Sequence, residues 1–122
     1  MNPTINEASV VETPNAAPAL FVLAPHDTVD QVLTVSQNAT IWPQAQCFMV
    51  AGGKLVAFDG TAACVAVAPI AIDATAGDVD FSVYVEGEFS EPALIREAAV
   101  ADPQTFLNAL AGSRITAKTP IS

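Results

Sequence analysis

The stretch from residue 47 to residue 89 constrains the fold more than any other part of the sequence, because it is a series of short apolar runs separated by turn signals. The pair Gly52-Gly53 divides two of these runs, and adjacent glycines at such a point favour a tight β-hairpin. From residue 79 onwards apolar and polar residues alternate with a period of two, which is typical of a half-buried β-strand. The apolar positions of this alternation are Val79, Phe81, Val83 and Val85. The stretch therefore predicts a β core, to which the segments before and after it are attached.

The same reasoning extends to the runs on either side of the hairpin. Apolar and β-branched residues bounded by turn-forming residues predict strands at residues 29–35, 47–50, 54–58, 64–68, 70–72 and 79–85, and an extended tail after residue 113. Pro69 has no N–H group to donate to a neighbouring strand. We therefore expect the backbone around Pro69 to be an edge strand, bulged or sharply bent.

The hydrophobic period changes after residue 89, where two short helices are predicted. Ser90 is a candidate N-cap for the first, with Glu91 and Pro92 in its first turn. Asp102 followed by Pro103 is a stronger start signal for the second, because the carboxylate can accept from N–H groups that have no partner within the helix. The apolar side and the C′ position of this helix are assigned to Phe106, Leu107, Leu110 and Gly112. Together with the strands, these helices predict a mainly β or α+β domain.

The first 25 residues hold four of the nine prolines, at positions 3, 14, 18 and 25. Proline at this density is incompatible with a helix and disturbs sheet hydrogen bonding. We therefore predict an extended N-terminal arm at residues 1–25, followed by a β-rich domain at residues 26–122. An extended segment with apolar side chains is suited to strand addition, in which it joins a sheet of another protein. The candidate binding residues are Val10, Val11, Leu20, Phe21, Val22 and Leu23. The alternative is that this segment folds back over its own domain.

The net charge of −9 excludes several classes of partner. Thirteen acidic residues outnumber four basic ones, and no Lys or Arg occurs before Lys54. A nucleic-acid-binding protein needs a basic surface to replace the counterions of the phosphates, so no nucleic-acid partner is expected. Binding to an anionic membrane surface is disfavoured for the same reason, and no apolar run is long enough to predict a membrane span. The first residues also lack the basic and apolar regions of a signal peptide.

The sequence contains no pattern that predicts catalysis, a cofactor or a metal site. His26 and Asp27 are adjacent, but no motif places a nucleophile beside them, so they are interpreted as a turn or strand-cap pair. Two cysteines and one histidine lack the spacing of a metal site. Cys47 and Cys64 are interpreted as half-buried free thiols, with a disulfide across the hairpin as the alternative. We therefore expect a protein that is not an enzyme.

Three segments, taken in order, resemble the lambda-type head decoration proteins of tailed phages. They are KLVAFDGT at residues 54–61, FSVYVEGEF at residues 81–89 and ALAGSRIT at residues 109–116. The resemblance covers residues 32–115. It implies a β-clip-like fold, a homotrimer, and binding to the major capsid protein at local three-fold axes of the mature head. The Pro-rich arm does not match motif residues of the family, so its role in capsid binding is carried over by position and character.

The function implied by this resemblance is that of a capsid decoration (cement) protein, which is made in the host cytoplasm and stabilises the lattice on the exterior of the virion. Its partners would be the major capsid protein and further copies of itself. The residues leave two other classes open: a β-rich adhesion module of a virion or cell surface, and a small enzyme subunit that uses His26, Asp27 and a cysteine. A single Trp and a single Tyr argue against an aromatic platform for carbohydrate.

Overall fold

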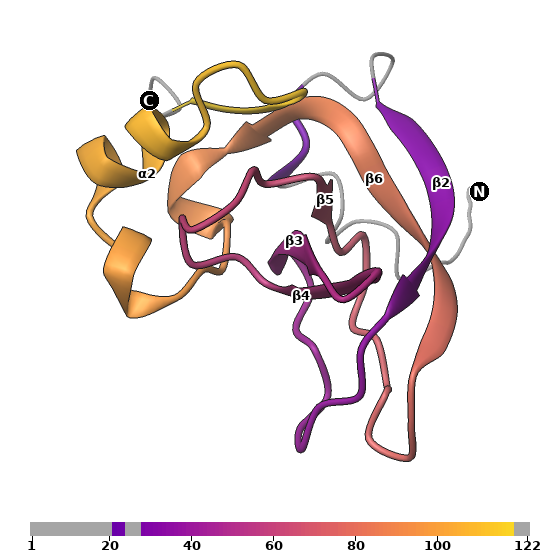
Figure 1. Cartoon of the computed structure of the whole chain (residues 1–122). Helices are drawn as coiled ribbons and strands as arrows, with labels where there is room; N and C mark the ends of the chain where they lie inside the picture. Colours follow the sequence, from indigo (N-terminus) through magenta and orange to yellow (C-terminus); the bar gives the residue numbers. More distant parts are fainter. Residues whose placement is uncertain (1–20, 24–27, 119–122) are drawn as a thin grey trace, which may run out of the picture.

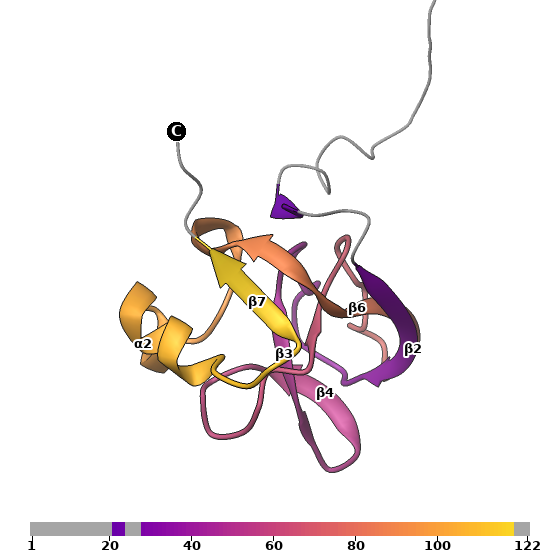
Figure 2. The same cartoon turned by 90° about the horizontal axis from the view of Figure 1, so that it is seen from above.

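The computed structural model describes residues 21–23 and 28–118 of the chain (Figure 1). Within these ranges the fold is mainly β, as predicted, and consists of a six-stranded mixed sheet, one α-helix and two 3₁₀ segments. The strands are β2 (Val29–Val35), β3 (Cys47–Ala51), β4 (Lys54–Ala57), β5 (Ala66–Val67), β6 (Val79–Ser90) and β7 (Ile115–Lys118). The helical segments are η2 (Glu91–Ala93), η3 (Ala98–Val100) and α2 (Pro103–Ala109). In Figures 1 and 2, α2 and β2 lie on opposite sides of the molecule.

Three of the strand predictions are confirmed closely. β2 occupies residues 29–35, and β3 and β4 form the hairpin predicted at Gly52-Gly53. The last pair of this hairpin is Ala51 with Lys54, which leaves a two-residue turn. Both turn glycines have left-handed φ angles, +60° and +78°, in a region that is unfavourable for residues with a Cβ atom. The turn geometry therefore explains why two glycines stand at this point.

β6 is the strand around which the sheet is built, and it extends to Ser90, beyond the end predicted at Val85. β2 pairs with it in antiparallel orientation, from Val35 opposite Val79 to Val29 opposite Glu86. β7 pairs with its C-terminal end in parallel orientation, and Figure 2 shows the two strands side by side. Because β2 also pairs with β4, the strands β2, β4, β3, β5 and β6 form a closed sheet, with β7 as an added edge strand.

Two of the pairings that close this sheet are short. β2 and β4 share one register pair, Val35 with Leu55, and β5 and β6 share one, Val67 with Tyr84. Before Val35, β2 is therefore paired with β6 alone. After Tyr84, β6 has left β5, and its next partner on that side is β7. At these two points the closed sheet is thus joined by a single register pair each.

The region between residues 64 and 72 contains less strand than predicted. Only Ala66–Val67 of the expected strand at residues 64–68 is paired as β5. The expected strand at residues 70–72 is reduced to an isolated bridge between Ile72 and Trp42. Pro69 lies between these two pieces and cannot donate a backbone hydrogen bond, which limits the pairing on both sides. The chain bends at Pro69, which is one of the alternatives predicted there, and the predicted strand lengths are wrong.

The two predicted helices have different outcomes. The first is a single 3₁₀ turn, η2, and its N-cap residue Ser90 makes no side-chain capping bond. The second is α2 and begins as predicted, because the carboxylate of Asp102 accepts from the backbone N–H of Thr105 at 3.0 Å. After α2, Gly112 has a left-handed φ angle of +81°, which suits the turn into β7. Among the described residues, only one of the two predicted helices is therefore an α-helix.

The buried side chains form two clusters. The cluster next to α2, here called the α2 core, is built around Phe58, Phe89, Phe106, Leu110 and Ile115. The cluster within the closed sheet, here called the sheet core, is built around Val35, Phe48, Leu55, Ile72 and Val83. The alternation along β6 is confirmed, because its four apolar positions lie in the sheet core or pack against it. Tyr84, on the opposite face of the strand, packs against the α2 core. β6 therefore has a core on each face.

Candidate docking groove

The described residues contain no group of three or more His, Cys, Asp or Glu side chains that could hold a metal ion. The carboxylates at residues 78, 80, 86 and 88 each have a polar or charged partner instead. These contacts join Asp78 to Lys54, Asp80 to the hydroxyl of Thr34 at 2.7 Å, Glu86 to Arg114 at 3.8 Å, and Glu88 to Lys118 at 2.8 Å. They act as separate pairs between neighbouring segments. His26 and Asp27 lie outside the described residues.

Cys47 and Cys64 are both free, and they are buried more deeply than the half-buried state that was expected. A hydrogen bond with the Cys64 thiol, together with burial, raises the pKa of the Cys47 thiol well above its usual value. The thiolate is the reactive form of cysteine, so a thiol held protonated in this way is a poor nucleophile. The interpretation of the pair as free thiols agrees with this structure.

Three of the six candidate arm residues lie in the described part of the chain. Phe21 is 3% exposed and Val22 is also buried, and both belong to the α2 core. The ring of Phe21 stacks on that of Phe89 with the centroids 5.8 Å apart. The backbone N–H of Leu23, whose side chain is 37% exposed, donates to the carbonyl of Glu88 at 2.8 Å. The remaining candidates, Val10, Val11 and Leu20, lie outside the described residues.

Residues 21–23 thus pack on the C-terminal end of β6, in agreement with the alternative in which this segment folds back over its own domain. Phe21 also meets the ring of Tyr84 edge-on at 6.2 Å, so two aromatic contacts hold it. Capsid binding through Phe21 and Val22 stays a prediction, and it would require both side chains to leave the α2 core. The part of the chain that is available as an arm is therefore the part before Phe21.

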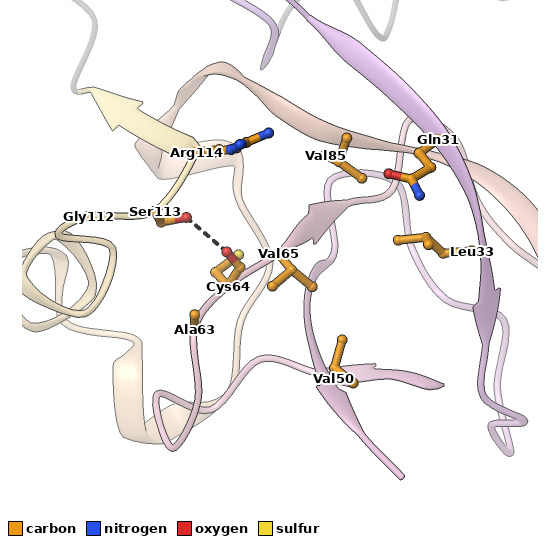
Figure 3. Close-up of a pocket in the computed structure, with 10 residues that line it drawn as sticks. All are labelled: Gln31, Leu33, Val50, Ala63, Cys64, Val65, Val85, Gly112, Ser113 and Arg114. Carbon is orange, nitrogen blue, oxygen red and sulfur yellow. Dashed lines mark hydrogen bonds between the residues drawn. The ribbon is translucent and has the colours of Figure 1, made fainter. Parts of the chain in front are cut away.

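The surface of the described residues is hollowed by an apolar groove with a volume of about 400 Å³, shown in Figure 3. Its walls are Leu33 of β2, Val50 of β3, Val65 before β5, and Val85 of β6, which surround one space in the figure. All of these except Val50 also pack against the sheet core. The side chain of Val50 is 50% exposed. The groove is therefore the place where the sheet core reaches the solvent.

The groove is open because the strands around it diverge. Leu33 precedes the point at Val35 where β2 meets β4, and Val85 follows the point at Tyr84 where β6 meets β5. Hydrogen-bonded strands lie about 4.8 Å apart, and where pairing ends the twist of each strand carries them away from each other. The apolar side chains at this point line the open groove.

The rim of the groove carries polar groups on two sides. Gln31 of β2 lies on one side, and Ser113 and Arg114, in the turn before β7, lie on the other. The hydroxyl of Ser113 donates to the carbonyl of Cys64 at 2.8 Å, which fixes this turn against the wall. The side chain of Arg114 is 81% exposed and lies 3.8 Å from the Glu86 carboxylate. An apolar cleft with an exposed cation at its edge is suited to an apolar group that also carries a carboxylate.

Arg96, to which the sequence pattern assigned no role, is buried and fully hydrogen-bonded. Its five N–H groups donate to the Glu91 carboxylate at 2.7 Å and to the carbonyls of Glu91, Leu94, Val100 and Ala101 at 2.9–3.1 Å. The guanidinium carbon lies 3.9 Å from the centroid of the Phe106 ring. A lone arginine within an apolar stretch, five residues after a glutamate, is the sequence signal that could have indicated this role. Because every donor is used, Arg96 stabilises the fold and cannot recruit a ligand.

Neither a scan against protein-family models nor a search of the curated proteins finds a match to this chain. Across the ranges that the structure describes, no helix is long and apolar enough to cross a membrane. The features that bear on function are therefore geometric: the groove, its charged rim, and the packing of residues 21–23 on the body.

Proposed function

We propose that this chain is a capsid decoration protein of a tailed phage, which stabilises the lattice of the major capsid protein. In this proposal it binds the exterior of the mature head as homotrimers at local three-fold sites. Its fold would be a compact one of β-clip type. It would act by binding alone, without a cofactor or a catalytic group.

The observation that carries the proposal is the convergence of the three segments that resemble the lambda-type decoration proteins. The first segment contributes Phe58 to the α2 core, the second contributes Phe89, and the third contributes Leu110 and Ile115. Segments this far apart in sequence meet in one core only through the tertiary fold. Their meeting is what we expect if the resemblance reflects a shared fold, and it therefore supports the proposal.

The surface of the molecule is suited to contacts with other chains. Among the described residues, the large apolar side chains that are more than a third exposed are Leu23, Val29, Val32, Ile41, Val50, Ile70 and Ile95. Burial of apolar surface between copies contributes about 25 cal/mol per Å², and a closed ring of copies can bury the same patches on every subunit. Because DNA is negatively charged, the net charge of −9 disfavours binding of such a protein to DNA released from the head.

In the proposed mechanism many copies each contribute a modest binding free energy. A ligand that binds only the expanded lattice stabilises that lattice by mass action. The arm before Phe21, with the candidates Val10, Val11 and Leu20, would add to a sheet of the capsid protein through backbone hydrogen bonds, while its apolar side chains fill pockets.

Deletion of residues 2–20 tests the role of the arm. The deletion stops before Phe21 because Phe21 and Val22 belong to the α2 core. The full-length chain and the deletion variant are sedimented with expanded heads made of the major capsid protein of the same phage, and the bound protein is quantified. We expect the full-length chain to saturate the heads and the variant to lose affinity by at least about tenfold, or 1.4 kcal/mol. Sedimentation equilibrium should give the mass of a trimer for both.

The outcomes separate the parts of the proposal. A full-length chain that does not bind expanded heads would refute the decoration function. A deletion variant that saturates heads at the same concentration would refute only the role of the arm. Binding of the full-length chain to host cells in place of heads would favour the adhesion module.

A further inference from the structure

We propose that the groove is a binding site for a segment of this same chain, residues 7–12, with the sequence EASVVE. The segment lies outside the described residues, so the argument rests on the groove, on charge and on reach. The proposal does not depend on the decoration function, because the contact would form within one copy of a protein with any role, in the state in which the segment is not bound to another protein.

The walls of the groove require an apolar occupant. Leu33, Val65 and Val85 already pack against the sheet core on one side, and the groove exposes their other side to solvent. Val50 stands at the edge with half of its surface exposed. An apolar side chain inserted between them would extend the sheet core outwards and remove all four from water, which is favourable.

The rim adds a requirement for negative charge. Three of the four basic residues of the chain have a carboxylate at 2.8 Å or closer: Lys54, Arg96 and Lys118. Arg114 is the exception, because among the described residues its carboxylate contact, with Glu86, is 3.8 Å long and its side chain is largely exposed. A carboxylate brought to the rim can therefore pair with Arg114 without displacing a close ion pair.

The N-terminal segment meets both requirements. Its two charged side chains, Glu7 and Glu12, are both negative, and they flank the apolar pair Val10-Val11. In an extended segment, residues two apart point to the same side and lie about 7 Å from each other. Val10 can therefore enter the groove while Glu12 lies at the rim beside Arg114. Pro14 favours an extended conformation in the residue that follows Glu12, which suits this geometry.

The connection is long enough. The described chain begins at Phe21, which packs on Tyr84 and Phe89, and the wall residue Val85 belongs to the same strand. Nine backbone steps join Glu12 to Phe21 and can span about 30 Å when extended, so the segment can pass around one strand to the other face.

Cleavage by a glutamate-specific endoprotease tests the contact in the full chain. Intact mass spectrometry follows the loss of residues 1–7 and 1–12 with time. Val50→Asp places a charge in the groove. Ser82→Asp is the control, because Ser82 is exposed on β6 of the same sheet and does not line the groove. If the protease cuts only the released segment, the cleavage rate follows the population of the released state, so Val50→Asp should speed cleavage by about tenfold and Ser82→Asp by less than about twofold.

A charge-reversal pair tests the rim independently of folding effects at Val50. Arg114→Glu should speed cleavage after Glu7, and so should Glu12→Arg. The double variant should restore slow cleavage, because the ion pair is rebuilt with its charges exchanged. Circular dichroism should give the same spectrum for all variants, since Arg114 is exposed and Glu12 lies in the arm.

The results decide the proposal. Protection that is independent of protein concentration supports binding within one copy, and protection that increases with concentration would overturn the proposal in favour of binding between copies. Equal cleavage rates in the unchanged chain and in Val50→Asp would overturn the proposal. It would also be overturned if Val50→Asp changed the mass of the assembly in sedimentation but left the cleavage rate unchanged, because the groove would then hold the body of another copy.

Discussion

The two ends of β6 are built in different ways. At the closed end, residues 87–90, the strand lies between residues 22–23 and β7, and Phe89 is fully buried in the α2 core. At the open end, residues 79–85, the strand pairs with β2, and Phe81 and Val85 are only partly covered at the edge of the sheet core. One strand therefore passes from a completed core to a core that reaches the solvent at the groove.

Charged groups differ between the two ends in the same way. At the closed end, Arg96 and Glu91 are paired in the interior, and each side chain is 7% exposed. At the rim of the groove, the side chain of Arg114 is largely exposed, and its carboxylate contact among the described residues, with Glu86, is 3.8 Å long. A satisfied interior pair specifies a single packing, whereas an exposed cation beside apolar walls is available for recognition. The closed end is therefore the more completely packed end of β6, and the groove proposed above as a binding site lies beside the open end.

The largest expected effect lies at the closed end. Arg96→Ala should destabilise the protein by about 3–5 kcal/mol, because it leaves the buried Glu91 carboxylate without its partner and removes the donors of four carbonyl groups. Urea unfolding followed by circular dichroism measures the change. Arg96→Lys is the control, since it keeps the charge but has three donors in place of five. Its free energy of unfolding should lie between those of the unchanged chain and Arg96→Ala. A loss below about 1 kcal/mol for Arg96→Ala would show that the closed end is not held together by this side chain.

The second largest expected effect tests whether Phe21 is part of the packed core at the closed end. Phe21→Ala should destabilise the protein by about 3 kcal/mol, because it removes a buried ring that contacts Phe89 and Tyr84. Leu23→Ala, two residues later and 37% exposed, should cost less than about 1 kcal/mol. Thermal unfolding of both variants is the measurement. Equal, small effects would place Phe21 in the arm and would shift the boundary of the body towards β2.

Local signals in the sequence were sufficient for several elements. The turn at Gly52-Gly53 gave the hairpin because both positions require left-handed backbone. Asp102 gave the start of α2 because its carboxylate bonds an N–H three residues away. The ends of β2 followed from its own pattern of residues and its turn signals. In each case the residues that determine the element lie within it or beside it.

Features that depend on distant residues could not be read in this way. β6 continues to Ser90 because Val22 and β7 pair with its last residues, and no pattern near residue 85 encodes that pairing. The apolar residues at positions 20–23 indicated burial but not whether it would occur on this chain or on another. The groove draws its walls from four separate segments, none of which is unusual locally. The mainly β class was therefore predictable, and the candidate site was not.

The smallest expected effect concerns Asp78, next to the open end. A hydrogen bond with Lys54 and another from the backbone N–H of Gln37, at 2.8 Å, hold the pKa of the Asp78 carboxyl below its usual range. A lowered pKa in the folded state means that the stabilisation is complete above the unfolded pKa of about 3.9 and is lost as the pH falls through the folded pKa. Asp78→Asn should therefore lower the Tm at pH 7 by no more than about 4 °C.

The dependence of this difference on pH and salt decides what it means. The Tm difference between the unchanged chain and Asp78→Asn should vanish in strong acid, where both carry a neutral group at residue 78, and should shrink in about 1 M salt. A difference that persists in acid would show that the ionised carboxylate is not its source. A difference as large as that of Arg96→Ala would mean that the exposed Lys54 contact holds the open end as firmly as the interior pair holds the closed end. Exposed ion pairs of this kind usually contribute little to stability. Such a result would therefore remove the contrast between the two ends of β6.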